Sequence, residues 1–421
     1  MKCLIGLGSN QGDRRQHLEQ AARALQLKCG SLIASPIVEN PALLLPGAPL
    51  SWRQPFLNAV VEVEWSGSPS ELLRLLNALE RQLGRVQSPR WSPRCIDLDL
   101  LTFGEQQVSE TDLQVPHVGL WDRSFVLVPL KHLRPSLSVP GHAGSVLSRS
   151  RELAESLPLW MGILNFTPDS FSDGGQLARQ DDVAMRLAQF EKAQVQIIDV
   201  GAESTRPGAR PVTPAEEWAR LQPHLELIQA VNKNRIFRPW ISVDTRHPET
   251  AVRAIELGVD IVNDVSGARH PGLLEAVRGS NCQYVLMHSL SVPADPSQTL
   301  SGDDPVGELR EWFDEKVEQL LRQGLAMDRV ILDPGIGFGK TAAQSWQLLA
   351  GVKEFMELPL RILVGHSRKS LFDLWGKTAA PDRDAETLGV SLQLAQKGVD
   401  ILRVHAPELH QRAWRAFQEA K

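Results

Sequence analysis

The chain has 421 residues, 42% hydrophobic and 23% charged, with a formal net charge of −5 at pH 7. This length is too great for one ordinary hydrophobic core, so we expect two domains, and the mild acidity argues against nucleic acid as a partner. The scattered cysteines form no C-x-x-C pair, which predicts neither a disulfide framework nor a zinc site. The N-terminal apolar run is too short for a signal peptide and no segment is long and apolar enough to span a bilayer. We therefore expect a cytoplasmic protein with no membrane partner.

The first part of the chain has the order strand, helix, strand, strand, helix, strand. The candidate strands are CLIGLGS (3–9), SLIASPIVE (31–39), FLNAVVEVEW (56–65) and CIDLDLLTF (95–103), and HLEQAARALQL (17–27) is the first candidate helix. The second helix is expected to begin at Ser68 as N-cap, with Pro69 at its first position and Glu71 completing a capping box. This order predicts an α+β domain of the ferredoxin-like type.

From about residue 158 the pattern changes to nearly continuous apolar strands, each followed by a helical stretch. The strand candidates are 159–166, 196–201, 240–245, 260–265, 284–289, 330–335, 361–367 and 401–406. Eight such strand–helix units predict a (β/α)₈ TIM barrel. We therefore expect a first domain at 1–147, a linker at 148–157 and a barrel domain at 158–421.

Two carboxylates, Asp97 and Asp99, lie two positions apart on a predicted strand and so point to the same face. Within the apolar run CIDLDLL they would repel each other unless a cation lay between them, and Mg²⁺ bridging nucleotide phosphates is the usual cation. Arg85, Arg90 and Arg94 lie shortly before them in the sequence and suit an anionic ligand. The alternative is an exposed edge strand with solvated side chains.

Polar residues also stand at the carboxyl ends of all the predicted barrel strands. They are Asn165, Thr205 with Arg206, Asp244, Asn263, His288, Asp333, Lys369, and Arg403 with His405. Any one of them could be a cap or a satisfied core hydrogen bond, but strand ends of a barrel converge on one mouth. The carboxylates and amides suit a flat heterocycle, the cationic side chains suit pyrophosphate, and Asn165 suits a hydrated Mg²⁺.

The barrel motifs NFTPDSFSDGG, DVGAESTRPGA, SVDT, VNDVSG, LDPGIGFGKT, GHSRKS and RVH closely resemble those of dihydropteroate synthase. The resemblance implies a Mg²⁺-assisted condensation of 6-hydroxymethyl-7,8-dihydropterin pyrophosphate with p-aminobenzoate, giving 7,8-dihydropteroate and pyrophosphate. It implies a pterin site made of Asp244, Asn263, Asp333 and Lys369, with Met287 packing on the ring and Asp244, Asp333 and Lys369 as catalytic residues. It implies a pyrophosphate and metal site of Asn165, Thr205, Arg206, Arg403 and His405, and a p-aminobenzoate site of Ser367 and Arg368, walled by Phe338 and Phe171.

The first domain carries GLGSNQGD, PFLNAVVEVE, GRV, RWSPRCIDLDLLTFG and VPHVGLWDRSFVLVPL, and resembles 6-hydroxymethyl-7,8-dihydropterin pyrophosphokinase across roughly 1–145. The resemblance implies pyrophosphoryl transfer from ATP to the pterin, with release of AMP. It implies a catalytic set of Arg85, Arg94, Asp97 and Asp99, in which both aspartates bind Mg²⁺. It implies a pterin site of Phe56, Asn58 and Phe125, and an ATP site of Arg85, Trp91, Arg94, His117 and Arg123. The order of the domains then follows the order of two reactions in folate biosynthesis.

Two features depart from the family pattern of the first domain. Val118 stands where an aromatic residue is usual, and the loop 39–52 is longer and more apolar than the corresponding loop of the family.

Two alternative functions are a pterin-dependent methyltransferase on the same barrel and an idle first domain. The GHSRKS lysine argues against the methyltransferase, and the retained Asp97–Asp99 pair argues against an idle first domain.

The stretch 384–398 has an apolar face that could join two barrels as a homodimer, and the sequence leaves the oligomeric state open.

Overall fold

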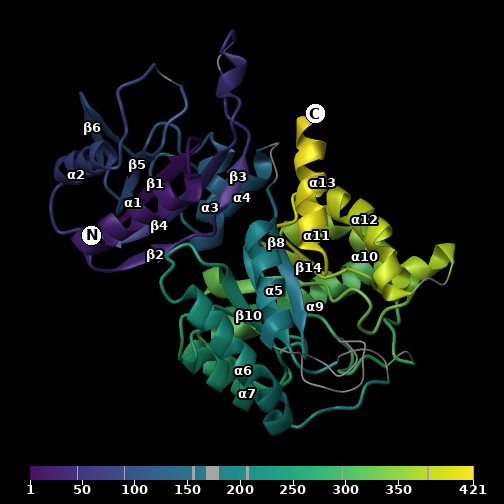
Figure 1. Cartoon of the computed structure of the whole chain (residues 1–421). Coiled ribbons are helices and arrows are strands. Elements are labelled where there is room, and N and C mark those ends of the chain that lie inside the picture. The colour runs from purple at the N-terminus through teal and green to yellow at the C-terminus, as the bar shows by residue number, and fades with distance from the viewer. Residues whose placement is uncertain are drawn as a thin grey trace. The chain divides into compact units, whose positions relative to one another are not determined.

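The computed structural model describes residues 1–44, 46–89, 91–153, 157–166, 180–204, 208–295, 297–376 and 379–420. The chain forms two compact units (Figure 1). The first contains Met1–Leu157 and the short segment Asn234–Arg238, and the second contains Pro158–Lys233 and Pro239–Lys421. None of the helices in the described part of the chain combines the length and apolarity needed to cross a membrane.

The first unit is built on an antiparallel sheet with the strand order β2-β4-β1-β5, and β3 also pairs with β4. Its elements are β1 (Lys2–Ser9), α1 (Arg14–Cys29), β2 (Leu32–Ala34), β3 (Val38–Asn40), η1 (Leu50–Trp52), β4 (Phe56–Glu64), α2 (Pro69–Gln82) and β5 (Asp97–Phe103). This is the predicted ferredoxin-like arrangement. The predicted capping box also forms, because Ser68 Oγ accepts from the Glu71 N–H and Glu71 Oε2 accepts from the Ser68 N–H.

Two expectations for this unit were wrong in detail. The single strand expected at 31–39 is divided into β2 and β3, because Pro36 between them has no N–H to donate to a ladder. The linker expected at 148–157 begins inside α4 (Val146–Glu152), whose N-cap is Ser145. Val146 and Leu147 are buried, so this helix is part of the folded unit.

The two faces of this sheet are covered differently. One face, with Ile5 and Leu7, forms a core with α1 and α2. The other face packs through Leu4 and Leu101 against the segment that follows the sheet. That segment contains β6 (Val108–Glu110), β7 (Leu113–Val115), α3 (Ser124–Leu133) and α4. The cover on this second face is incomplete, and the cavity described below occupies the part that remains.

The second unit is a closed barrel with the order β10-β11-β12-β13-β14-β15-β8-β9, in which neighbouring strands are parallel. The strands are β8 (Leu159–Asn165), β9 (Ile197–Gly201), β10 (Trp240–Asp244), β11 (Ile261–Asp264), β12 (Gln283–Met287), β13 (Val330–Asp333), β14 (Arg361–Val364) and β15 (Ile401–Val404). The helices are α5 (Gln180–Lys192), α6 (Pro214–Asn232), α7 (Pro248–Glu256), α8 (Pro271–Arg278), α9 (Pro305–Arg322), α10 (Ala342–Ala350), α11 (Val352–Met356), α12 (Asp384–Lys397) and α13 (Pro407–Glu419), with 3₁₀ turns η2 (Met327–Arg329), η3 (Ser370–Trp375) and η4 (Ala380–Arg383). The predicted TIM barrel is confirmed, with each expected strand in its place.

Candidate active sites

Glycines form the floor of a cavity of about 320 Å³ in the first unit. On β1, Gly8 pairs with Asn58 of β4 on one side and with Asp97 of β5 on the other, so these residues form one row across the sheet. In the next row on the same face, Gly6 lies between Val60 and Asp99. Because glycine has no side chain, the space above β1 stays open between the carboxylates and the amide.

The two aspartates point into this cavity from one side, as the alternation of a strand requires. Arg85 lies 2.6 Å and Arg94 2.9 Å from the carboxylate of Asp97, and His117 lies 3.8 Å from Asp99. Burial raises the pKa of Asp99, and the neighbouring charge of Asp97 raises it further. A cation would relieve this repulsion, and two carboxylates are the hard oxygen ligands that Mg²⁺ prefers.

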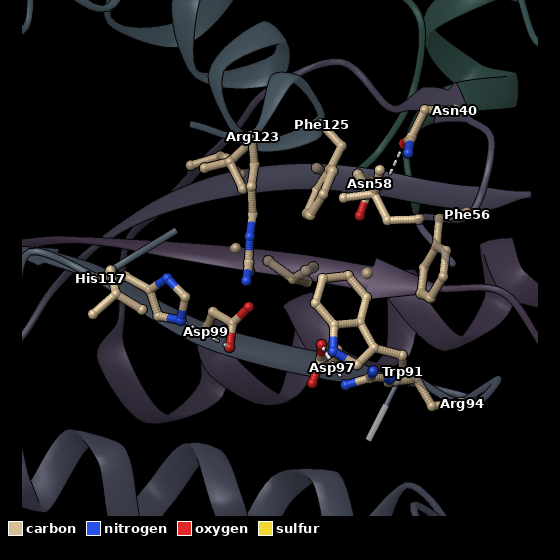
Figure 2. A pocket seen from close by; sticks show the side chains of 18 of the residues that line it. Asn40, Phe56, Asn58, Trp91, Arg94, Asp97, Asp99, His117, Arg123 and Phe125 are labelled. Atoms are coloured by element: carbon tan, nitrogen blue, oxygen red, sulfur yellow. Dashed lines mark hydrogen bonds and ion pairs between the residues drawn. The ribbon is translucent and has the colours of Figure 1, made fainter. Parts of the chain in front are cut away.

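Aromatic side chains and Arg123 enclose the same cavity. The Arg123 guanidinium lies 5.8 Å from the ring centre of Trp91 and 5.7 Å from that of Phe125. Figure 2 shows Asp97 and Asp99 on one side and Asn58 with Phe125 on the other. The catalytic, pterin-site and ATP-site residues that the resemblance implied for this domain all line the cavity: Phe56, Asn58, Arg85, Trp91, Arg94, Asp97, Asp99, His117, Arg123 and Phe125.

The cavity also contains residues that the sequence reasoning missed. Asn40, the last residue of β3, and Leu43 belong to the stretch 39–52 that we described only as a departure from the family, and Val118 lines the wall as well. A polar residue in the apolar context ENPALLL was the available signal for Asn40. Arg90, which was expected near the phosphates, lies outside the described residues.

In the second unit, a row of polar residues crosses the carboxyl end of the barrel. Asn165 pairs with Gly201, Gly201 with Asp244, and Asp244 with Asn263, across β8, β9, β10 and β11. A Cβ on Gly201 would lie 3.1 Å from Asn165 Oδ1 and 3.4 Å from Asp244 Cβ, so glycine again makes room between the functional groups. The Oδ1 atom of Asn263 is buried and has no hydrogen-bond partner among the described residues, which suits a ligand donor.

Arg403 lies between two carboxylates at this end of the barrel. Its Nε is 2.6 Å from Asp199 Oδ2 and its Nη2 is 2.8 Å from Asp244 Oδ2. The sequence reasoning assigned Arg403 to the pyrophosphate and missed Asp199, a fully buried carboxylate inside the apolar strand IIDVG. Burial raises the pKa of Asp244, whereas the Arg403 charge opposes that rise.

Asp333 and Lys369 approach each other from β13 and from the turn after β14. Burial raises the pKa of Asp333, whose Oδ1 accepts from the Gly335 N–H at 2.8 Å. Burial lowers the pKa of Lys369 to about 8, although the nearby Asp333 charge opposes this effect. Lys369 donates to the Ile336 carbonyl, and its ammonium lies 4.5 Å from the ring centre of Phe338. Met287 is buried and pairs with Asp333 in the register of β12 and β13.

The residues expected near p-aminobenzoate are already engaged with the protein. Ser367 Oγ lies 3.0 Å from His405 Nδ1 and accepts from the His405 backbone N–H at 3.2 Å. Arg368 forms a two-pronged pair with Asp384 of α12, at 2.7 and 2.8 Å. To bind a carboxylate, Arg368 would have to share or exchange that pair. The expected residues Thr205, Arg206 and Phe171 lie outside the described part of the chain.

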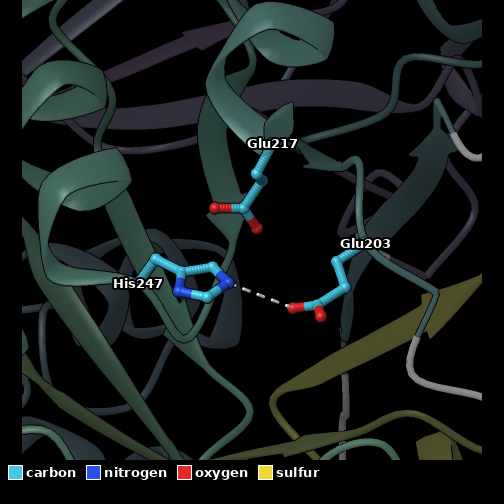
Figure 3. A group of neighbouring side chains, drawn as sticks. All are labelled: Glu203, Glu217 and His247. Atoms are coloured by element: carbon cyan, nitrogen blue, oxygen red, sulfur yellow. Dashed lines mark ion pairs between the residues drawn. The ribbon is translucent and has the colours of Figure 1, made fainter. Parts of the chain in front are cut away.

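Glu203, Glu217 and His247 form a group whose potential ligand atoms all lie within 4.8 Å of one another (Figure 3). Both oxygens of Glu203 already accept from Arg246, at 2.7 and 2.8 Å. Burial alone would raise the pKa of Glu203, but hydrogen bonds from His247 and Arg246 outweigh it and lower the pKa to about 2. A divalent cation would have to displace this guanidinium, so the group is an ion network that joins the end of β9 to the end of β10.

The chain matches two family models: "7,8-dihydro-6-hydroxymethylpterin-pyrophosphokinase (HPPK)" over residues 4–135 and "Pterin binding enzyme" over residues 161–405. It is 37% identical to the folate synthesis bifunctional protein of Chlamydia caviae, over 97% of this chain and 96% of that protein. It is 35% identical to the mitochondrial folate synthesis bifunctional protein of Arabidopsis thaliana, over 96% of this chain and 80% of that protein.

Solved structures of dihydropteroate synthases are also similar to this chain. The dihydropteroate synthase of Anaplasma phagocytophilum with bound 6-hydroxymethylpterin-monophosphate has a TM-score of 0.57 and 33% identity, and covers 63% of this chain and 99% of its own. The Xanthomonas albilineans dihydropteroate synthase with 4-aminobenzoic acid has a TM-score of 0.57 and 36% identity, and covers 62% of this chain and 93% of its own. The chain therefore belongs to the bifunctional folate synthesis family, in which a 6-hydroxymethyl-7,8-dihydropterin pyrophosphokinase domain precedes a dihydropteroate synthase domain.

Proposed function

We propose that the two sites of this chain carry out the two successive reactions of its family with the residues described above. In the first unit the hydroxymethyl oxygen of 6-hydroxymethyl-7,8-dihydropterin attacks the β-phosphorus of ATP. The bond between that phosphorus and the bridging α–β oxygen breaks, and AMP leaves. The observation that carries this assignment is the row Asn58–Gly8–Asp97, which sets a heterocycle contact and a phosphate contact on either side of one open floor.

Asp97 and Asp99 are the residues that would hold Mg²⁺, which would neutralise the transferred phosphates. Arg85 and Arg94 are paired with Asp97. A cation at Asp97 would take over the neutralisation of that carboxylate and leave both guanidinium groups for the phosphate oxygens. Catalysis in this unit then consists of positioning and charge compensation, without a protein nucleophile.

In the barrel, the bond between the pterin methylene carbon and pyrophosphate breaks, and the amine of p-aminobenzoate forms a new bond to that carbon and loses a proton. Asp244, Asn263, Asp333 and Lys369 hold the heterocycle, and the buried oxygen of Asn263 accepts one of its N–H groups. Arg403 bridges Asp244 to Asp199 and supplies positive charge near the leaving group. Asn165 is the residue that would hold a Mg²⁺ ion there. Homodimerisation through 384–398 and a cytoplasmic location stay predictions from the sequence.

The test is to supply 6-hydroxymethyl-7,8-dihydropterin, ATP, Mg²⁺ and labelled p-aminobenzoate, and to measure AMP and labelled dihydropteroate together. We expect both products, and chelation of Mg²⁺ by EDTA should stop AMP formation until Mg²⁺ is restored. Dihydropteroate formed only from supplied pterin pyrophosphate would mean that the first unit is idle. AMP without dihydropteroate from either source would overturn the barrel assignment.

A further inference from the structure

Two buried amides at the cavity of the first unit form a short hydrogen-bonded chain. The Asn58 Nδ2 group donates to Asn40 Oδ1, and the Asn40 Nδ2 group donates to the Pro41 carbonyl at 2.9 Å. Both asparagines are only 6% exposed. Asn40 on β3 pairs with Phe56 of β4, so Asn40 and Asn58 are diagonal neighbours on one face of the sheet.

The backbone carbonyl fixes the orientation of both amides. A carbonyl oxygen can only accept, so Asn40 must turn its amino group toward Pro41 and its oxygen toward Asn58. Asn58 must then present its amino group to Asn40. The reverse orientation of either side chain would put two donors or two acceptors in contact, which is costly in a buried position.

The Asn58 oxygen is consequently turned away from Asn40. A Cβ on Gly8 would lie 2.9 Å from Asn58 Oδ1, so this oxygen lies above the glycine floor of the cavity. Figure 2 shows the Asn58 oxygen directed into the space between Phe125, Phe56 and Trp91, opposite the bond to Asn40. Among the residues that the structure describes, none donates a hydrogen bond to this oxygen. The cavity thus presents a hydrogen-bond acceptor of fixed orientation between aromatic rings.

We propose that Asn40 is a positioning residue that sets the pterin specificity of the first unit through Asn58. The fixed Asn58 oxygen accepts from the N3–H and 2-amino edge of the heterocycle, and a freely rotating amide would offer a donor to that edge in part of the molecules. The inference rests on the proposed function, because it requires the pterin to occupy this cavity. It assigns a role to Asn40, the last residue of β3, which lies at the start of the stretch 39–52 where this chain departs from the family pattern.

Two substitutions at Asn40 separate orientation from structure. Asn40→Asp keeps an acceptor toward Asn58, and when protonated it can still donate to the Pro41 carbonyl, so the orientation of Asn58 is retained. Asn40→Leu keeps the number and branching of the side-chain heavy atoms but has no polar atom, so it releases the Asn58 amide. We expect Asn40→Leu to raise the Kd for 6-hydroxymethylpterin and the KM for the dihydropterin about tenfold. Asn40→Asp should stay within about threefold, and both variants should keep the wild-type KM for ATP and the wild-type kcat.

A double-mutant cycle with Asn58→Leu shows whether Asn40 acts through Asn58. We expect Asn40→Leu to have no further effect on the Kd for 6-hydroxymethylpterin once Asn58 is Leu. An equal loss in both backgrounds would overturn the proposal, because Asn40 would then act on the ligand or the loop by itself. Equal losses for Asn40→Asp and Asn40→Leu would overturn it as well. A wild-type protein that binds ATP but not 6-hydroxymethylpterin would instead refute the proposed function of this cavity.

Discussion

Replacement of Arg403 by Met tests the assignment of this residue as the buried cation of the barrel mouth. The substitution keeps much of the side-chain volume and removes two hydrogen bonds, at 2.6 Å to Asp199 and 2.8 Å to Asp244. The Asp199 side chain is 0% exposed and that of Asp244 14% exposed, so water cannot replace the guanidinium at Asp199. Removal of one partner from a buried pair costs about 3–5 kcal/mol of the free energy of unfolding.

The matched control is Arg322→Met. Arg322 pairs with Glu318 on α9, but these side chains are 71% and 65% exposed, and such surface pairs contribute about 0–1 kcal/mol. Hydrogen exchange in peptides from β9, β10 and β15 should therefore accelerate by roughly two to three orders of magnitude in Arg403→Met and hardly at all in Arg322→Met. Peptides from β1 and β4 serve as an internal reference, and AMP formation should persist in both variants.

The loss of stability in Arg403→Met should depend on pH. Burial raises the folded-state pKa of Asp244, and without the Arg403 guanidinium no positive charge of Arg403 opposes that rise above the unfolded value. The folded state then binds more protons than the unfolded state, so the free energy of unfolding falls as pH rises. The destabilisation should be smaller near about pH 5 than near about pH 8. Adding Asp199→Asn should recover part of the stability without restoring dihydropteroate formation. Exchange rates equal to those of Arg322→Met would refute the reasoning.

Three further predictions concern the other site residues. Asp97→Asn or Asp99→Asn should lower AMP formation by about two orders of magnitude or more, with dihydropteroate formation from supplied pterin pyrophosphate unchanged; loss of both activities would contradict separate sites. The Lys369 pKa of about 8 predicts that dihydropteroate formation declines as pH rises through that value, because the ammonium is lost. A rate of dihydropteroate formation that keeps rising beyond about pH 9 would count against a role for the Lys369 ammonium. Gly8→Ala places a methyl group 2.9 Å from Asn58 Oδ1 and should raise the KM for the dihydropterin about tenfold with little change in the KM for ATP, measured by AMP release.

Much of the fold follows from local patterns that the sequence displays. The capping box at Ser68, the two-residue spacing of Asp97 and Asp99, and the alternation of apolar strands with helices depend on neighbours in the chain. The closed barrel follows from the number of strand–helix units, and the polar residue at each strand end marks its mouth. Sequence reasoning erred where tertiary packing decided the local structure, as in the expected linker, whose first part is the end of helix α4, which is anchored by the buried Val146 and Leu147.

Only the tertiary structure decided which distant residues meet. Gly8 lies between Asn58 and Asp97 because the sheet order places β1 between β4 and β5, and no local pattern states that order. Arg403 and Asp199 are 204 positions apart in the chain and meet because the barrel closes by the pairing of β15 with β8 and β8 with β9. The sequence by itself determined the kinds of side chain that the sites contain. The register of the paired strands determined which of them are neutralised, which are oriented by a neighbour and which keep an atom for the ligand, because these properties depend on contacts of a few ångströms between remote segments.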